Sequence, residues 1–86
     1  MAEYQITIKP SAVKELEGLP ASVASRVATK IKALAATPRP PGVKKLEGKP
    51  IRWRIRAGDW RVIYSIDDKA RIVDIFYIRH RSKAYD

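Results

Sequence analysis

The stretch from residue 51 to residue 57 alternates strictly between apolar and basic side chains, and this pattern constrains the fold more than any other feature. The apolar positions are Ile51, Trp53, Ile55 and Ala57, and the positions between them are Arg52, Arg54 and Arg56. A period of two is typical of a strand with one buried face and one solvated face. The segment is therefore predicted to be a half-buried strand that carries its arginines away from the core.

A second strand is predicted over residues 60–66, and the apolar pattern sets the register of the resulting hairpin. Placing Arg56 opposite Arg61, across a loop of residues 57–60, gives the apolar pairs Ile55–Val62, Trp53–Tyr64 and Ile51–Ile66. A shift by one residue would set Ile55 against Arg61 and mix the two faces, which strict alternation penalises. The apolar register predicts that Arg54, Arg56 and Arg61 converge on the opposite face.

Two helices are predicted between a short strand over residues 4–9 and the hairpin. The first begins at Pro10 and Ser11, with Ser11 as N-cap and with Val13 and Leu16 toward the core, and it ends at Gly18. The second begins at Pro20 and ends before the proline-rich residues 38–42. Its apolar stripe is formed by Val23, Val27, Ile31 and Leu34.

A last strand is predicted over residues 71–78, apolar on both faces as an interior strand would be, and residues 79–86 are predicted to form a polar tail. The order β-α-α-β-β-β indicates an α+β domain in which a helical hairpin packs on one face of a small, mainly antiparallel sheet. All 86 residues are expected to form one domain, since a chain of this length has no room for a second core.

The charge of the chain indicates the class of its partner. Eighteen Lys and Arg against nine Asp and Glu give a formal net charge of +9, while 45% hydrophobic residues argue against disorder. The absence of cysteine excludes a disulfide scaffold, a thiol nucleophile and a cysteine zinc site. No apolar run is long enough to span a bilayer, and no secretion signal is recognisable. A cytoplasmic domain that binds a polyanion is the expectation.

The arginines of the hairpin have the strongest claim to a function. Like charges directly opposite on a sheet destabilise it, so placing Arg56 against Arg61 gains no stability. In the alternation of the last strand, Arg71, Val73, Ile75, Tyr77 and Arg79 would share a face, which lets Arg79 join the group. A solvated basic face is the plainer alternative, but the arginine fork matches phosphate geometry. More diffuse binding to nucleic acid is expected of Lys44, Lys45, Lys49, Arg52, Arg81 and Lys83.

Aromatic and titratable residues are further candidates for functional residues. Trp60, expected in the loop beside the arginines, could stack on a base or could cap the hairpin. Tyr85 lies in the polar tail, where core packing explains it poorly. His80, the only histidine, cannot supply both an acid and a base. No His/Asp/Glu cluster has metal-ligand spacing and no glycine-rich phosphate loop is present, so neither a metal nor a cofactor is predicted.

The chain resembles the RelE toxins of the RelE/ParE superfamily over essentially its whole length, since that superfamily has the same β-α-α-β-β-β order, and two segments carry the resemblance. Residues 45–64, with Lys45-Leu46-Glu47-Gly48, Trp53-Arg54-Ile55-Arg56 and Gly58-Asp59-Trp60-Arg61-Val62-Ile63-Tyr64, are similar to the central hairpin of that family. Residues 79–85 are similar to its C-terminal motif of basic residues followed by a tyrosine. The resemblance implies a microbial-ribonuclease-like fold and a toxin of a type II toxin–antitoxin pair that cleaves mRNA in the ribosomal A site.

The resemblance also implies roles for single residues. Arg54 and Arg56 stand where the family has two basic, usually lysine, residues, and Arg61 stands at the phosphate-binding arginine. Arg79 matches the arginine of charge stabilisation and leaving-group protonation, and Tyr85 the tyrosine that orients or activates the reacting nucleotide. Arg56, Arg61, Arg79 and Tyr85 are therefore the predicted catalytic residues. Arg54 and Arg81 are expected to bind RNA.

Two other functions remain open on the residues alone. A ParE-like poison of DNA gyrase would share the fold without cutting nucleic acid, and a binding-only module would occlude RNA without cleaving it. The second alternative rests on the missing base, because Arg54 and Arg56 stay protonated where relatives have lysine. A toxin of this kind also implies a RelB-like antitoxin with an acidic segment, besides the ribosome and mRNA.

Overall fold

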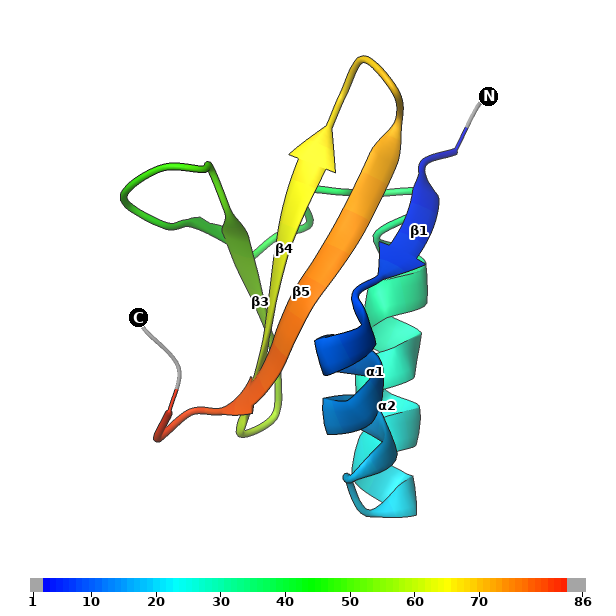
Figure 1. Cartoon of the computed structure of the whole chain (residues 1–86). Coiled ribbons are helices and arrows are strands. Elements are labelled where there is room, and N and C mark those ends of the chain that lie inside the picture. The colour runs from blue at the N-terminus through cyan, green and yellow to red at the C-terminus, as the bar shows by residue number, and fades with distance from the viewer. Residues whose placement is uncertain (1–2, 84–86) are drawn as a thin grey trace.

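Five strands form one sheet in the order β1-β5-β4-β3-β2, with two helices packed against one of its faces (Figure 1). The computed structural model describes residues 3–83. Its elements are β1 (Gln5–Ile8), α1 (Pro10–Glu17), α2 (Ala21–Ala33), β2 (Lys44–Lys45), β3 (Trp53–Ala57), β4 (Trp60–Asp67) and β5 (Ile72–His80). The predicted α+β architecture is confirmed, and the two-residue strand β2 is an addition to the predicted order.

The sheet is antiparallel except at one edge. β1 pairs with β5 in parallel, and the remaining neighbours are antiparallel, as predicted. β5 lies inside the sheet and extends to His80, so Arg79 and His80 belong to this strand and not to a tail. The prediction of a polar tail from residue 79 was wrong at its first two positions.

The predicted register of the β3–β4 hairpin is confirmed, with Arg56 opposite Arg61 and Ile55 opposite Val62. The turn is tighter than predicted, because Ala57 pairs with Trp60 and Gly58 takes a φ of 63° that suits a short hairpin turn. The predicted strand start at Ile51 was wrong. Ile51 lies before β3 and is 50% exposed, so it does not pack against Ile66.

The core lies between the helices and the sheet. Val27, Ile31 and Leu34 are buried as predicted, together with Tyr64, whose hydroxyl donates a hydrogen bond to the Pro38 carbonyl (2.7 Å). In α1 the buried residue is Ala12, whereas Val13 is 38% exposed, contrary to prediction. Pro10 itself is the first residue of α1, and Lys9 takes the N-cap position. Ser11 is therefore inside the helix and not its cap.

A β-bulge in β5 changes which side chains share a face. Tyr77 pairs with Ile63 but Ile75 pairs with Tyr64, so Phe76 is an extra residue on β5. Ile75 therefore points to the helices and is fully buried, like Val73, whereas Tyr77 and Arg79 lie on the other face. The prediction that Val73, Ile75, Tyr77 and Arg79 share one face was wrong, although Arg79 does lie where that prediction put it.

Neither helix in the described part of the chain is long and apolar enough to cross a membrane.

Candidate functional site

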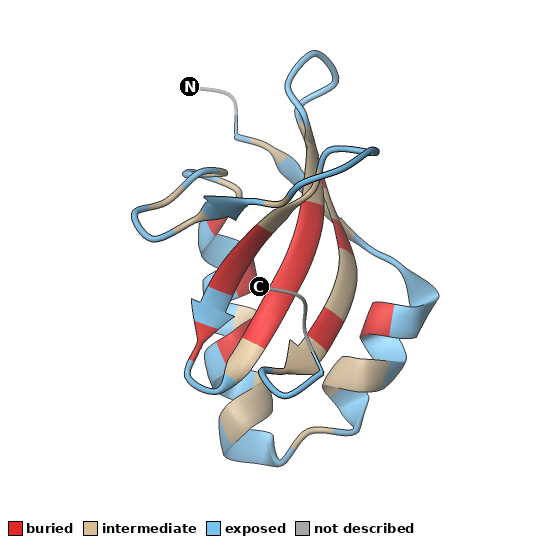
Figure 2. Ribbon diagram, turned by 90° about the vertical axis from the view of Figure 1, so that its left-hand side faces the viewer, coloured by how far each residue is buried: buried red, intermediate tan, exposed pale blue. Residues whose placement is uncertain are grey.

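Three arginines form a row across three adjacent strands. They lie on the face of the sheet that the helices leave open, which faces the viewer in Figure 2. Arg56 of β3 pairs with Arg61 of β4, and Arg61 pairs in turn with Arg79 of β5. We call these three residues the arginine row. Like charges at directly opposed positions oppose folding, by a few tenths of a kcal/mol to about 1 kcal/mol per pair. The row therefore concentrates positive charge without adding to the stability of the sheet.

Arg61, at the centre of the row, is held by the hairpin turn beside it. One of its terminal nitrogens, Nη1, donates to the carbonyls of Gly58 and Trp60, each at 3.3 Å. Arg61 is only 6% exposed, which fixes the position of its guanidinium at the middle strand. The tight turn thus does more than connect two strands, since its carbonyls orient a predicted catalytic residue.

Arg79 is held from two directions. Its Nε donates to Oε2 of Glu15 on α1 (3.0 Å), and its guanidinium carbon lies 4.3 Å from the centre of the Tyr77 ring. Glu15 also accepts a hydrogen bond from the backbone N–H of Ile78 (3.0 Å). Sequence reasoning missed Glu15, because nothing in the sequence distinguishes it from Glu17 on the same helix.

Arg54 and Arg52 extend the basic face toward the start of β3. Arg54 lies opposite Ile63, on the side of the sheet that carries the arginine row, and is 4% exposed. Alternation predicts that the basic face is solvated, whereas the Arg54 side chain is buried. Arg52 lies over two rings of β5, with its guanidinium carbon 4.4 Å from the centre of Phe76 and 5.6 Å from that of Tyr77. Such cation–π contacts fix an arginine without neutralising its charge.

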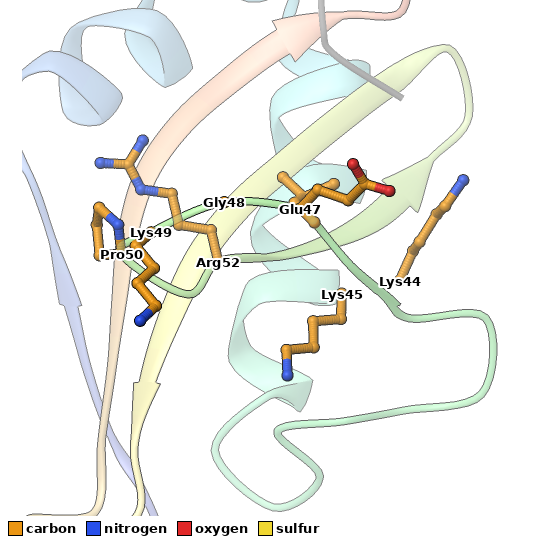
Figure 3. A pocket seen from close by; sticks show the side chains of 8 residues that line it. Lys44, Lys45, Glu47, Gly48, Lys49, Pro50 and Arg52 are labelled. Atoms are coloured by element: carbon orange, nitrogen blue, oxygen red, sulfur yellow. The ribbon is translucent and has the colours of Figure 1, made fainter.

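Three of the lysines expected to bind RNA, Lys44, Lys45 and Lys49, lie in β2 and the loop that follows it, beside this face. A hollow of about 720 Å³ is lined by Lys44, Lys45, Leu46, Glu47, Gly48, Lys49, Pro50 and Arg52. Figure 3 shows the side chains of these lining residues from close by. Lys44 pairs with Arg54 and Lys45 with Trp53, so the two lysines lie on alternate faces of β2. Only Lys44 therefore shares the face of the arginine row by its register.

The segment after β5 begins next to the hairpin turn. The backbone N–H of Arg81 donates to the Asp59 carbonyl (2.8 Å), and its Nε lies 3.8 Å from Oδ1 of Asp59. Lys83 is exposed, and its N–H donates to the His80 carbonyl (2.8 Å). In Figure 1 this segment leaves β5 on the side of the sheet away from the helices. Tyr85, the remaining predicted catalytic residue, lies outside the described residues.

Trp60 is not in a loop beside the arginines, contrary to prediction. It is the first residue of β4, where alternation puts it on the helix side while Arg61 is on the open side. Its ring packs against the core and meets the His80 ring edge-on at 5.4 Å between centres. Trp60 and Arg79 nevertheless both line one hollow beside the end of β5, and stacking of Trp60 on a base stays a prediction.

The arrangement of this face is suited to binding an anion by several guanidinium groups. Arginine donates several hydrogen bonds in a rigid fork, and two forks side by side can contact the oxygens of one phosphate group. Within residues 3–83, no group of three His, Cys, Asp or Glu side chains could hold a metal ion.

Comparison with known proteins identifies the family. Residues 6–85 match the family described as the ParE toxin of type II toxin–antitoxin system, parDE. The chain is also 34% identical over 89 residues to the Toxin RelE of Mycobacterium tuberculosis. The alignment covers 95% of this chain and 86% of that relative. The protein belongs to the RelE/ParE toxins of type II toxin–antitoxin systems.

Solved structures agree with this family and with the RelE branch of it. The RelE-RelB complex from Pyrococcus horikoshii OT3 contains a chain 34% identical, with a TM-score of 0.82 over 94% of this chain and 98% of that one. A chain of the RelBE2 toxin–antitoxin complex from Mycobacterium tuberculosis is 26% identical, with a TM-score of 0.80 over 92% and 99% of the two chains. The predicted membership among RelE-type toxins is confirmed.

Proposed function

We propose that this toxin is a ribosome-dependent endoribonuclease that cleaves mRNA in the ribosomal A site and so stops translation in the cytoplasm. The arginine row is the observation that carries the proposal, because Arg56, Arg61 and Arg79 stand in register on one open face. A phosphate-binding role would explain why the sheet retains these destabilising like-charge pairs. The RelE relatives make RNA the proposed source of that phosphate.

The proposed reaction is attack of an RNA 2′-hydroxyl on the neighbouring phosphorus. The 2′-oxygen bonds to phosphorus and loses its proton, a dianionic phosphorane forms, and the bond to the 5′-oxygen breaks as that oxygen takes up a proton. Arg61 at the centre of the row would bind the phosphate, with Arg56 and Arg79 stabilising the added charge from either side. Arg79, at the end of the row, is proposed to donate a hydrogen bond to the leaving oxygen, which takes up its proton from water.

The base that takes the 2′-hydroxyl proton is proposed to be Tyr85. Arginine remains protonated, so neither Arg54 nor Arg56 can take the role that a lysine could fill. Neighbouring cations favour the ionised form of a phenol, which would make Tyr85 a better base than an isolated tyrosine. Replacement of Tyr85 by Phe is expected to abolish most cleavage, and full cleavage by that variant would exclude the assignment.

Binding to the ribosome is proposed to rest on the wider basic surface. Lys44, Lys45, Lys49, Arg52, Arg54, Arg81 and Lys83 are the proposed RNA contacts. Contacts of this kind release counterions, so the affinity for ribosomes is expected to fall steeply as salt rises. Alanine at the three lysines of the loop is expected to weaken binding with little effect on the cleavage rate at saturation.

The proposed protein partner is a RelB-like antitoxin. Two of the similar structures are complexes of a RelE-type toxin with its antitoxin. A net charge of +9 would match an acidic antitoxin segment laid on the open face. Copurification of this toxin with the product of an adjoining short reading frame is the direct test.

One experiment separates the proposed nuclease from its rivals. Primer extension is carried out on mRNA from a translating extract, with and without the toxin, and with an Arg61→Ala control. New 5′ ends in phase with codons support the nuclease, whereas stalled but intact mRNA would overturn it in favour of a binding-only module. Naked RNA is expected to remain uncut, since the site has no strong internal base.

A gyrase poison is the second candidate, because the matching family is described by its ParE toxins. Breaks in supercoiled DNA that appear only with gyrase and this toxin, together with intact mRNA, would favour it. The arginine row argues for the nuclease, since a poison that acts on gyrase needs no phosphate-facing row.

A further inference from the structure

Within residues 3–83, Glu15 contributes the carboxylate that contacts the arginine row, and it comes from the helix layer and not from the sheet. β1 covers the edge of β5 only as far as Ile75, where Ile8 pairs with it. Beyond that point α1 takes over the same edge, and the Glu15 carboxylate bridges two consecutive residues of β5. One oxygen accepts from the Ile78 N–H and the other from Nε of Arg79, both at 3.0 Å.

This arrangement determines how Arg79 is presented to the open face. Nε of Arg79 is taken by Glu15 and the flat face of its guanidinium lies over Tyr77 at 4.3 Å. Two contacts in different directions leave the planar group little freedom to rotate. Within the described part of the chain, its two Nη groups carry no hydrogen bond, so they remain able to donate to a phosphate.

We propose that Glu15 is a positioning residue for RNA cleavage, which holds Arg79 by Nε so that its Nη groups meet the scissile phosphate. This inference rests on the proposed nuclease function and adds to it a residue outside the sheet and tail. An alternative reading of the same contact is inhibitory: Glu15 would neutralise Arg79 and would have to release it before RNA binds. The two readings predict opposite effects when the carboxylate is lost.

Glu15→Gln is the variant that isolates this contact. The amide oxygen of glutamine can still accept from the Ile78 N–H, but its NH₂ group would then face another donor at Arg79 Nε. The variant therefore keeps the link between α1 and β5 and loses the hold on Arg79. Glu17→Gln is the matched control, because Glu17 is exposed on the same helix.

The measurement is single-turnover cleavage of mRNA on programmed ribosomes, over a range of ribosome concentrations. Glu15→Gln is expected to lower the rate at saturation by about ten- to a hundredfold, the loss expected when a catalytic group is misplaced by about 1 Å. The ribosome concentration that gives half the maximal rate is expected to stay the same. Glu17→Gln should match the wild type in both quantities.

A double-variant cycle then tests whether Glu15 acts through Arg79. In an Arg79→Ala background, Glu15→Gln is expected to change the residual rate by less than about twofold, because the group that it positions is gone. Full, independent effects of the two substitutions would overturn the proposal. A cleavage rate for Glu15→Gln equal to that of the wild type would overturn it as well. A cleavage rate above that of the wild type would overturn it in favour of the inhibitory reading.

A readout that does not depend on cleavage is the exchange rate of the Arg79 Nε proton, measured by NMR of the free toxin. It is expected to rise in Glu15→Gln and to stay unchanged in Glu17→Gln, whereas an unchanged rate in Glu15→Gln would contradict the contact. If the wild type does not cleave mRNA at all, the proposed function fails. If the wild type cleaves and Glu15→Gln cleaves equally well, only the positioning role fails.

Discussion

The two ends of the sheet both carry arginine, but the surroundings of these arginines differ. Beside the β4–β5 turn, Arg39 makes two hydrogen bonds to the Asp68 carboxylate (3.1 and 2.8 Å) and lies 4.9 Å from the centre of the Trp53 ring. The Tyr4 hydroxyl donates to the same carboxylate (2.6 Å). We call Tyr4, Arg39, Trp53 and Asp68 the connector clasp. At the other end, the members of the arginine row are one another's neighbours.

The difference indicates what each end is for. The clasp ties the proline-rich connector to the sheet, and every charge in it meets an opposite charge or a ring. The row sets three cations side by side in register, and Glu15 binds the one on β5. Residues that break local stability rules, such as like charges at opposed positions of a sheet, are expected at functional sites. Substitutions in the row should therefore cost activity, and those in the clasp should cost stability.

The largest expected effect comes from replacing one arginine of the row by an uncharged residue. Arg56→Thr removes an exposed cation and introduces a residue that favours strands, so the free energy of unfolding should stay equal or rise by up to about 0.5 kcal/mol. The mRNA cleavage rate should fall by about a hundredfold, as when one donor to a developing negative charge is lost. Urea unfolding and cleavage on ribosomes measure the two quantities.

Arg39→Gln tests the clasp, and its expected effects on stability and on cleavage are the opposite of those of Arg56→Thr. It should lower the free energy of unfolding and leave cleavage unchanged. A clear loss of stability in Arg56→Thr, or a loss of cleavage in Arg39→Gln at a temperature where it is folded, would remove the distinction between the two ends.

A medium effect is expected at Tyr64, which connects the core to the connector. Tyr64→Phe removes the hydrogen bond to the Pro38 carbonyl (2.7 Å) from a side chain that is fully buried. The loss of one such bond should cost about 1 kcal/mol in the free energy of unfolding. Urea unfolding of both proteins measures the cost, and an unchanged midpoint would show that the connector does not depend on this bond.

The smallest effect concerns the pH dependence of the clasp. The Arg39 guanidinium and the Tyr4 hydroxyl, both hydrogen-bonded to Asp68, lower the pKa of that carboxyl to about 2. The stability that Asp68 contributes is therefore fully present above its unfolded pKa of about 4 and is lost as the pH falls through about 2. Because Asp68 is exposed, the contribution is expected to be small and sensitive to salt.

Asp68→Asn tests this dependence. The difference in unfolding free energy between the wild type and the variant should shrink as the pH is lowered from about 5 to about 2, since both then lack the carboxylate. Urea unfolding across that range measures it, with Glu17→Gln as a control for general effects of removing an acid. A difference that stays constant with pH would show that the clasp does not depend on the charge of Asp68.

The hairpin shows how far the sequence could be read. Alternation over the two strands predicted the pairing of Arg56 with Arg61, because a shifted register would have buried charge and exposed apolar side chains. The same logic failed in β5, where Phe76 is an extra residue and reverses the alternation after Ile75. A strand that is apolar on both faces contains no signal that would locate a bulge. The position of Trp60 was missed because the turn is shorter than its loop-like residues suggested.

The sequence by itself determined the α+β class, the β3–β4 register and the presence of arginines on the face away from the helices, because these follow from local periodicity and the burial of apolar side chains. Only the tertiary structure decided that Arg79 completes the row, since this depends on the bulge and on the pairing of β4 with β5. It also decided that Glu15 holds Arg79, a contact between residues 64 positions apart in the chain. Local pattern cannot specify a contact between an irregular strand and a helix side chain, because their distance is set by how the two layers pack.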